Sequence, residues 1–325
     1  MFNCIIAIFF TLYFNILVNE GDKMENKQRL IGIVLAILGA SFWGLGGTVS
    51  DYLFRHQNVD INWYVTARLL VSGLILLFIF KLLNPKLTIF SIFHNIQSTI
   101  QLFIFSIFGM LLVQYSYMAS INYGNAAVAT LLQYIAPVYI IIWFVLRKKA
   151  NFKLFDLIAM LLTISGTFLL LTNGSIHNLV VPSSSVIWGI ISGLSLAFYT
   201  IYASRLLVKF PAILVVGWAM LISGLLMNFK APIWQFSITQ LNFANVSYLT
   251  FGIIFGTAMA FFFFIKSLNY LSAKETTLFG TIEPVMAIVA SAFWLKVSFL
   301  PYQLLGILLI IILILTLSLK KEQER

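Results

Sequence analysis

Two ionisable side chains, Arg68 and Glu283, lie well inside apolar stretches of this chain. An ionised group in the hydrocarbon of a membrane costs roughly 2.5 to 3.5 kcal/mol on insertion scales, so each needs a reason. Glu283 stands directly before Pro284, whose ring removes one backbone hydrogen bond and leaves carbonyl groups free. A carboxylate beside free carbonyls could bind a ligand ammonium group or a proton. Alternatively, a protonated Glu283 caps its own kinked helix.

Arg68 keeps its positive charge in a protein. It could be the counter-ion of a ligand carboxylate or of Glu283. The alternative is a structural role, in which the side chain extends to the outer interface or binds carbonyl groups at a helix end. The sequence favours the structural role, because Arg68 lies only one or two turns from the outer end of its apolar stretch.

Neutral polar residues form two short stripes at helical spacing. Thr130, Gln133 and Pro137 fall three and four residues apart, and Gln114 and Tyr117 are three apart, so each set shares one helix face. Such stripes either line a cavity or form hydrogen bonds between helices.

Aromatic residues make up 16% of the chain, and most of them are expected to pack between helices or at the membrane interface. Trp43 and Tyr199 lie near the centres of two apolar stretches, and we predict that they form pocket walls. A pocket with aromatic walls and few polar groups suits small amphipathic molecules. The predicted substrate-binding residues are therefore Glu283, Gln133, Trp43, Tyr199, Arg68, Tyr117 and Gln114, with helix breaks at Pro137 and Pro284.

Composition identifies the elements that must position these residues. With 61% hydrophobic and 9% charged residues, the chain has too little polar surface for a water-soluble globule. Apolar runs of roughly 20 residues, enough to cross a bilayer as helices, recur along it. We predict an all-α polytopic membrane protein with ten transmembrane helices, over residues 30–50, 63–83, 99–119, 126–146, 154–172, 186–206, 211–228, 247–267, 276–295 and 301–319.

The distribution of positive charge predicts the topology of these helices. Of the 20 Lys and Arg residues, sixteen fall on one side of the membrane and three on the other (Arg55, Lys230 and Lys296), with Arg68 inside a span. Positively charged segments remain in the cytoplasm, so both termini are predicted to be cytoplasmic, in the cell (plasma) membrane. The net charge of +10 is thereby explained by topology, and nucleic-acid binding is not expected.

One segment of the chain occurs twice. Residues 107–137 align without a gap to residues 254–284, and both copies contain Ser-x-Asn-Tyr followed fourteen residues later by Pro. Five spans per copy is an odd number, so the two copies enter the membrane from opposite sides and form inverted-topology repeats. The predicted organisation is a first repeat over residues 30–172, a connecting loop over 173–185, a second repeat over 186–319 and a cytoplasmic tail over 320–325.

Residues 1–29 form an N-terminal extension and cytoplasmic tail. Residues 1–18 are apolar but lack the basic start and the small-residue cleavage site of a signal peptide. They could be an extra membrane segment or an uncleaved anchor. We favour a third reading, in which residues 1–23 lie upstream of the true start at Met24.

The chain resembles the EamA-type transporters of the drug/metabolite transporter (DMT) superfamily, whose ten-helix members contain two five-helix repeats. The resemblance covers about residues 30–319 and is most specific in the second half, in residues 265–273 (IKSLNYLSA) and 282–284 (IEP). In the first half it rests on Ala67-Arg68-Leu69-Leu70 and on the repeated Ser-x-Asn-Tyr. The chain departs from the family where Lys149 and Lys296 replace an acidic residue after the fourth and ninth spans, which argues against a mechanism that uses a carboxylate there.

Together, the inverted repeats and the resemblance predict a secondary or facilitative transporter of small metabolites or amino acids that works by alternating access. The resemblance favours export over uptake. A channel and a membrane enzyme are the less favoured alternatives, because neither a selectivity-filter signature nor a catalytic or nucleotide-binding motif occurs. The expected partners are the lipid bilayer and a small-molecule substrate, with or without a coupling proton, in a monomer or a weak homodimer. No cofactor, metal or catalytic residue is predicted.

Overall fold

The computed structural model describes residues 23–148, 154–235 and 243–319, which form helices and connecting turns without a strand. The predicted status of residues 1–23 falls almost entirely outside this part of the chain. The first half contains α2 (Lys23–His56), α3 (Ile61–Leu83), η1 (Ser91–His94), α4 (Ile96–Ile104), η2 (Phe105–Leu111), α5 (Leu112–Tyr123), α6 (Ala126–Gln133), α7 (Ala136–Leu146) and α8 (Leu154–Thr172). The second half contains α9 (Ser183–Leu207), α10 (Ala212–Lys230), α11 (Phe243–Thr250), η4 (Phe251–Met259), α12 (Ala260–Ser267), α13 (Ala273–Gly280), α14 (Ile282–Phe293) and α15 (Pro301–Leu319).

Eight helical segments of the described chain are long and apolar enough to cross a membrane. The all-helical, multi-pass prediction is therefore confirmed, and eight of the ten predicted spans coincide with these segments. The fifth and tenth spans correspond to α8 and α15, whose described apolar portions are shorter. The count of ten transmembrane helices stays a prediction.

The first helix is longer than expected. The sequence predicts a span that ends at residue 50, whereas α2 continues to His56 without interruption. Asp51 consequently lies inside the helix and is fully buried, with 0% of its surface exposed. The expectation that only Arg68 and Glu283 are ionisable groups well inside the spans is therefore wrong. The sequence places the end of the first span just before its first charged residue, Asp51, and does not show that neighbouring helices bury this residue.

Both halves share an irregularity in their third span. The segments η2 and η4 are π-helical turns at matching positions of the repeat, between α4 and α5 and between α11 and α12. A π-helical turn widens the helix locally and is frequent at functional sites. The sequence repeat is therefore accompanied by a repeat of local backbone structure.

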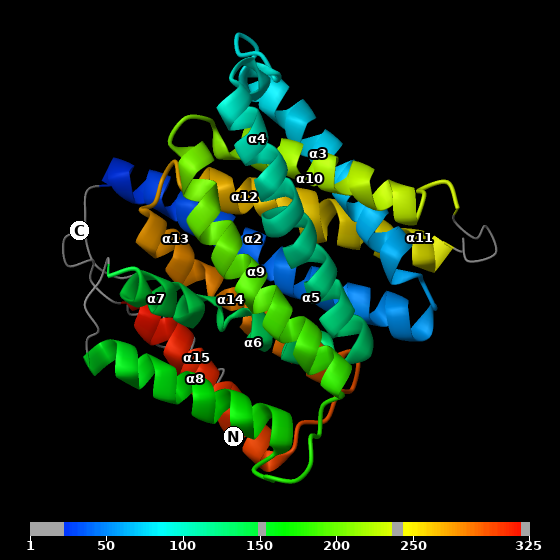
Figure 1. The fold of residues 1–325 in the computed structure, drawn as a ribbon, viewed down its shortest axis with the longest axis vertical. Helices are drawn as coiled ribbons and strands as arrows, with labels where there is room; N and C mark the ends of the chain where they lie inside the picture. The colour runs from blue at the N-terminus through cyan, green and yellow to red at the C-terminus, as the bar shows by residue number, and fades with distance from the viewer. Residues whose placement is uncertain (1–22, 149–153, 236–242, 320–325) are drawn as a thin grey trace.

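The two halves are interleaved in space. The first helix of each half packs on the third and fourth spans of the other half: α2 contacts η4, α12 and α14, and α9 contacts η2, α5, α6 and α7. The second spans, α3 and α10, pair with each other, as do the fifth spans, α8 and α15. Figure 1 shows the α8 and α15 pair at one end of the molecule and the α3 and α10 pair towards the other. Each half therefore completes its core with helices from the other.

Candidate functional site

Two helix breaks, one from each half, define the centre of the candidate site. The fourth span is interrupted between α6 and α7, and the ninth between α13 and α14 at Thr281. Pro137 lies in the first turn of α7 and Pro284 in the first turn of α14. Proline is tolerated at such a position because its missing N–H would lack an intrahelical partner there in any case.

Tyr134 joins the two breaks. Its hydroxyl lies 2.9 Å from Oε2 of Glu283 and 3.0 Å from the carbonyl oxygen of Gly280, the last residue of α13. Tyr134 directly follows α6, which packs against α14. The carboxylate predicted from the sequence therefore receives its hydrogen bond from the other half of the molecule rather than from the backbone of its own helix. Tyr134 is not among the substrate-binding residues predicted from the sequence.

A close helix contact lies beside Glu283. A Cβ atom on Gly44 of α2 would overlap the carbonyl oxygen of Glu283 and approach the backbone of Ala287. Only glycine allows α2 to come this near to the break. Glu283 is thus enclosed by the first helix of one half and by Tyr134 from the same half.

Arg68 is buried, with 4% of its surface exposed. One terminal nitrogen lies 3.3 Å from the sulfur of Met118 on α5, and Nε is buried without a hydrogen-bond partner. The described structure therefore shows neither of the two contacts that the structural alternative predicted for Arg68, and the role of this residue stays a prediction. The side chain does not extend to an interface, because packing of α3 in the interior covers it, and no helix-end carbonyl accepts a hydrogen bond from it in the described structure.

The polar stripes connect helices. Nε2 of Gln133 donates to the hydroxyl of Ser192 on α9 at 2.7 Å, and the hydroxyl groups of Tyr117 and Thr130 lie 2.8 Å apart, joining α5 to α6. Tyr117 lies within electrostatic range of Glu283 and Arg68, but no hydrogen bond or ion pair joins these three predicted residues to one another in the described structure. Gln114 is buried on α5, one turn before Tyr117.

The predicted aromatic walls both lie at contacts between the halves. The Trp43 ring lies 4.8 Å and 4.9 Å, between centroids, from two phenylalanine rings of α12, Phe261 and Phe264. The Tyr199 ring lies 4.8 Å from Phe105 in η2. Neither side chain makes a hydrogen bond within the described structure, so their role as pocket walls stays a prediction.

Asp51 is the buried carboxylate that the sequence reading missed. Its Oδ2 accepts a hydrogen bond of 2.9 Å from the backbone N–H of Ala126, the first residue of α6, and its Oδ1 lies 2.6 Å from Nε of Arg55. At the same terminus the side chain of Asn125 accepts from the N–H of Val128. Two side chains therefore satisfy the N–H groups at the start of the broken fourth span. The spacing of Asp51 and Arg55, four residues apart on a helix, was the available signal.

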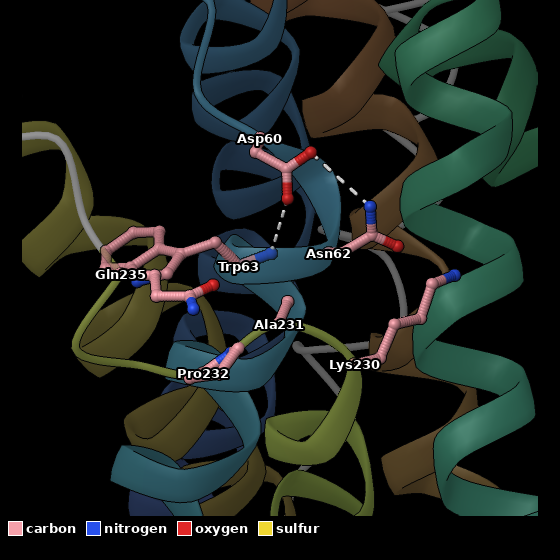
Figure 2. Close-up of a pocket in the computed structure, with 7 residues that line it drawn as sticks. All are labelled: Asp60, Asn62, Trp63, Lys230, Ala231, Pro232 and Gln235. Atoms are coloured by element: carbon pink, nitrogen blue, oxygen red, sulfur yellow. Dashed lines mark hydrogen bonds between the residues drawn. The ribbon is translucent and has the colours of Figure 1, made fainter.

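A separate pocket of about 280 Å³ lies where α3 begins and α10 ends (Figure 2). It is lined by Asp60, Asn62, Trp63, Lys230, Ala231, Pro232 and Gln235. Asp60 is occupied as the N-cap of α3, and the Lys230 ammonium lies 5.1 Å from the centre of the Tyr115 ring. No residue of the two broken spans lines this pocket, so it is distinct from the Glu283 cluster.

Comparison with known proteins agrees with this architecture. Residues 30–172 and 183–319 each match the EamA-like transporter family. The chain is 31% identical over 295 residues to the "Uncharacterized inner membrane transporter YicL" of Salmonella typhimurium, covering 90% of this chain and 97% of that protein. A solved crystal structure with 15% sequence identity covers 89% of this chain and 95% of its own, with a TM-score of 0.57, which supports the fold alone. The protein is thus a multi-pass membrane transporter and not an enzyme, and the chain belongs to the EamA-like transporter family.

Proposed function

We propose that this protein is a secondary or facilitative transporter that moves small metabolites or amino acids out of the cell by alternating access between its two halves. The observation that carries the proposal is the link between the two helix breaks, in which Tyr134 of one half binds Glu283 of the other. Inverted-repeat transporters commonly bind their substrate where such discontinuous helices meet. The name of the Salmonella relative, an inner membrane transporter, supports the cell membrane as the location.

The interleaving of the halves supports alternating access. Because α2 packs on the third and fourth spans of the second half, and α9 on those of the first, a tilt of one half changes the contacts of both. Exchange of these two symmetry-related sets of contacts would open the Glu283 cluster first to one side of the membrane and then to the other. Uptake of the same solutes differs only in the direction of the gradient, so the same site would serve it.

Glu283 is proposed to bind either the substrate or a coupling proton. A neutral glutamine keeps the shape of the side chain and removes the cost of a buried charge, so Glu283→Gln is expected to reach the membrane in near-normal amounts. Transport per inserted molecule is expected to fall tenfold or more, equivalent to about 1.4 kcal/mol of lost interaction. Any dependence of transport on pH is expected to flatten.

The test has two stages. Untargeted metabolite profiling of cells and medium, with and without expression, identifies the solute and the direction of its net movement. Transport of that solute is then measured in proteoliposomes at two pH values for the wild type, Glu283→Gln and the control Asp60→Asn, which changes an exposed carboxylate at the start of α3. Normal activity of Glu283→Gln with an unchanged pH response would exclude a transport role for Glu283. A profile that is identical with and without expression would contradict the proposed function.

A further inference from the structure

The guanidinium group of Arg68 is incompletely bonded. It has five N–H donors in a planar fork. One nitrogen reaches the sulfur of Met118 at 3.3 Å, which is a poor acceptor, and Nε is buried with no partner. Within the described residues, no carboxylate oxygen lies within the 4.0 Å of an ion pair. The strongest donor group in the interior is therefore left with capacity to bind something else.

The polar groups that face Arg68 are engaged elsewhere. Tyr64, Tyr117 and Glu283 lie within electrostatic range of its guanidinium group. The Tyr64 hydroxyl lies 2.9 Å from that of Ser50, the Tyr117 hydroxyl 2.8 Å from that of Thr130, and Glu283 takes a hydrogen bond from Tyr134. Each neighbour thus already has a partner of its own. The N–H donors of Arg68 therefore remain available to a ligand rather than being used within the protein.

Protein stability does not explain why a guanidinium group with unused N–H donors is buried here. A buried charge with poor partners destabilises a fold, and a neutral side chain of similar size often restores or raises stability. Arginine is also the side chain whose geometry matches a carboxylate with two parallel hydrogen bonds. Arg68 thus differs from Gln133 and Thr130, whose hydrogen bonds hold helices together.

We infer that Arg68 is an anion-binding residue that holds a carboxylate group of the transported solute. The inference rests on the proposed function and deepens it, because it states a chemical group that the solute must carry.

Binding is tested first, with probes that differ in a single group. Thermal unfolding of the purified protein is measured with acetate, benzoate and 3-phenylpropionate, and with the amide of each. A ligand that binds only the folded protein raises the melting temperature, by an amount that grows with the logarithm of its concentration above the dissociation constant. We expect at least one carboxylate, and none of the amides, to raise the melting temperature of the wild type. The shift should be absent in Arg68→Met. Equal shifts in Arg68→Met, equal shifts with the amides, or no shift with any carboxylate at saturating concentration would overturn the inference.

The unliganded variants provide a second measurement. Arg68→Met removes the charge and keeps an unbranched side chain, so its melting temperature without ligand should equal or exceed that of the wild type. Transport per inserted molecule should nevertheless fall tenfold or more. Arg68→Lys keeps the charge but lacks the planar set of N–H donors, so its transport should lie between that of the wild type and that of Arg68→Met. Arg205→Gln changes an exposed arginine that stacks on Tyr202 at 5.1 Å and should behave as the wild type.

The outcomes distinguish this inference from the proposed function. A lower melting temperature of Arg68→Met, together with normal transport by the surviving molecules, would show a structural role and overturn the inference while the transporter stands. Metabolite profiling that finds only solutes without an anionic group would do the same. Carboxylate binding that depends on Arg68, in a protein that moves no solute, would contradict the proposed function and leave the anion site in place.

Discussion

The carboxylate of Asp51, near the end of α2, accepts a hydrogen bond of 2.9 Å from the backbone N–H of Ala126, where α6 begins. Near the other end of the same helix, Arg29 pairs at 3.1 Å with Glu275 in the first turn of α13. A single helix is thus linked at its two ends to the starts of both broken spans. Because these two spans carry Tyr134 and Glu283, α2 links the two helix breaks to each other.

Removal of the Asp51 link should destabilise the protein. Asp51→Ala leaves the N–H of Ala126 and the charge of Arg55 without this partner, and hydrogen bonds to charged groups contribute about 1.5 to 3 kcal/mol. Asp51→Asn keeps an acceptor oxygen and should lose less. In thermal unfolding of the purified proteins, the melting temperature should decrease in the order wild type, Asp51→Asn, Asp51→Ala. The matched control is Asp60→Ala, which removes an exposed N-cap worth about 1 kcal/mol. A melting temperature for Asp51→Ala at or above that of Asp60→Ala would contradict the role given to Asp51.

The Arg29 link should behave differently, because its side chains are 36% and 34% exposed. Ion pairs of this kind contribute about 0.2 to 1 kcal/mol and weaken with salt. Arg29→Gln should therefore lower the melting temperature only slightly and more at low than at high ionic strength. A double-mutant cycle with Glu275→Gln measures the pair directly. A large coupling that salt does not change would show that the pair is more buried than the structure indicates.

Tyr134 and Glu283 should act as a unit in transport. Tyr134→Phe removes the hydroxyl that binds both Glu283 and the Gly280 carbonyl, and we expect transport to fall at least threefold. Residues that share a hydrogen bond typically show coupling of about 0.5 to 3 kcal/mol. In the Glu283→Gln background the same change should therefore have a much smaller effect. Initial rates in proteoliposomes for the wild type, both single variants and the double variant decide this, and strictly multiplicative effects would refute the coupling.

The contact between Gly46 and Gly256 should tolerate no side chain. A Cβ atom on Gly46 would lie 2.6 Å from the Cα atom of Gly256, so α2 and η4 would have to separate. Overpacking of this kind costs about 1 to 3 kcal/mol. Gly46→Ala should lower the melting temperature of the protein. In Gly280→Ala the new atom would meet only the Phe264 ring, at 3.2 Å, so this control should be milder. Equal melting temperatures for the two variants would mean that the helices are less tightly packed.

Topology is tested with reporters fused within the loops. The sixteen-to-three distribution of Lys and Arg predicts a cytoplasmic signal after Lys209 and an external signal after Asn173. The same reasoning predicts cytoplasmic signals after Lys149 and Arg325 and an external one after Asn242, three positions outside the described residues. Lys209 lies in the turn between the first two spans of the second half. An external signal there would contradict the predicted inverted orientation of the two repeats.

Features that depend on local sequence could be predicted without the structure. The apolar runs indicate membrane-crossing helices because length and composition alone decide whether a segment can span a bilayer. Pro137 and Pro284 indicate helix breaks because proline acts on its own turn. The repeated Ser-x-Asn-Tyr indicates a duplicated unit, and the family match over residues 30–172 and 183–319 agrees with it. Each of these signals is contained within a few tens of residues.

Only the tertiary structure decided which residues meet. Whether Arg68 reaches an interface or remains buried depends on the packing of α10, η4 and α5 around α3, and the expected contact of Arg68 with the interface is not found. The contacts of Asp51 with Ala126 and of Tyr134 with Glu283 join residues 75 and 149 positions apart in the chain. In an interior so apolar, many helix arrangements satisfy the same hydrophobic pattern. The few polar contacts that select one arrangement depend on how close helix backbones approach, as at Gly44 and Gly46, and that distance is a property of the assembled bundle rather than of any single segment.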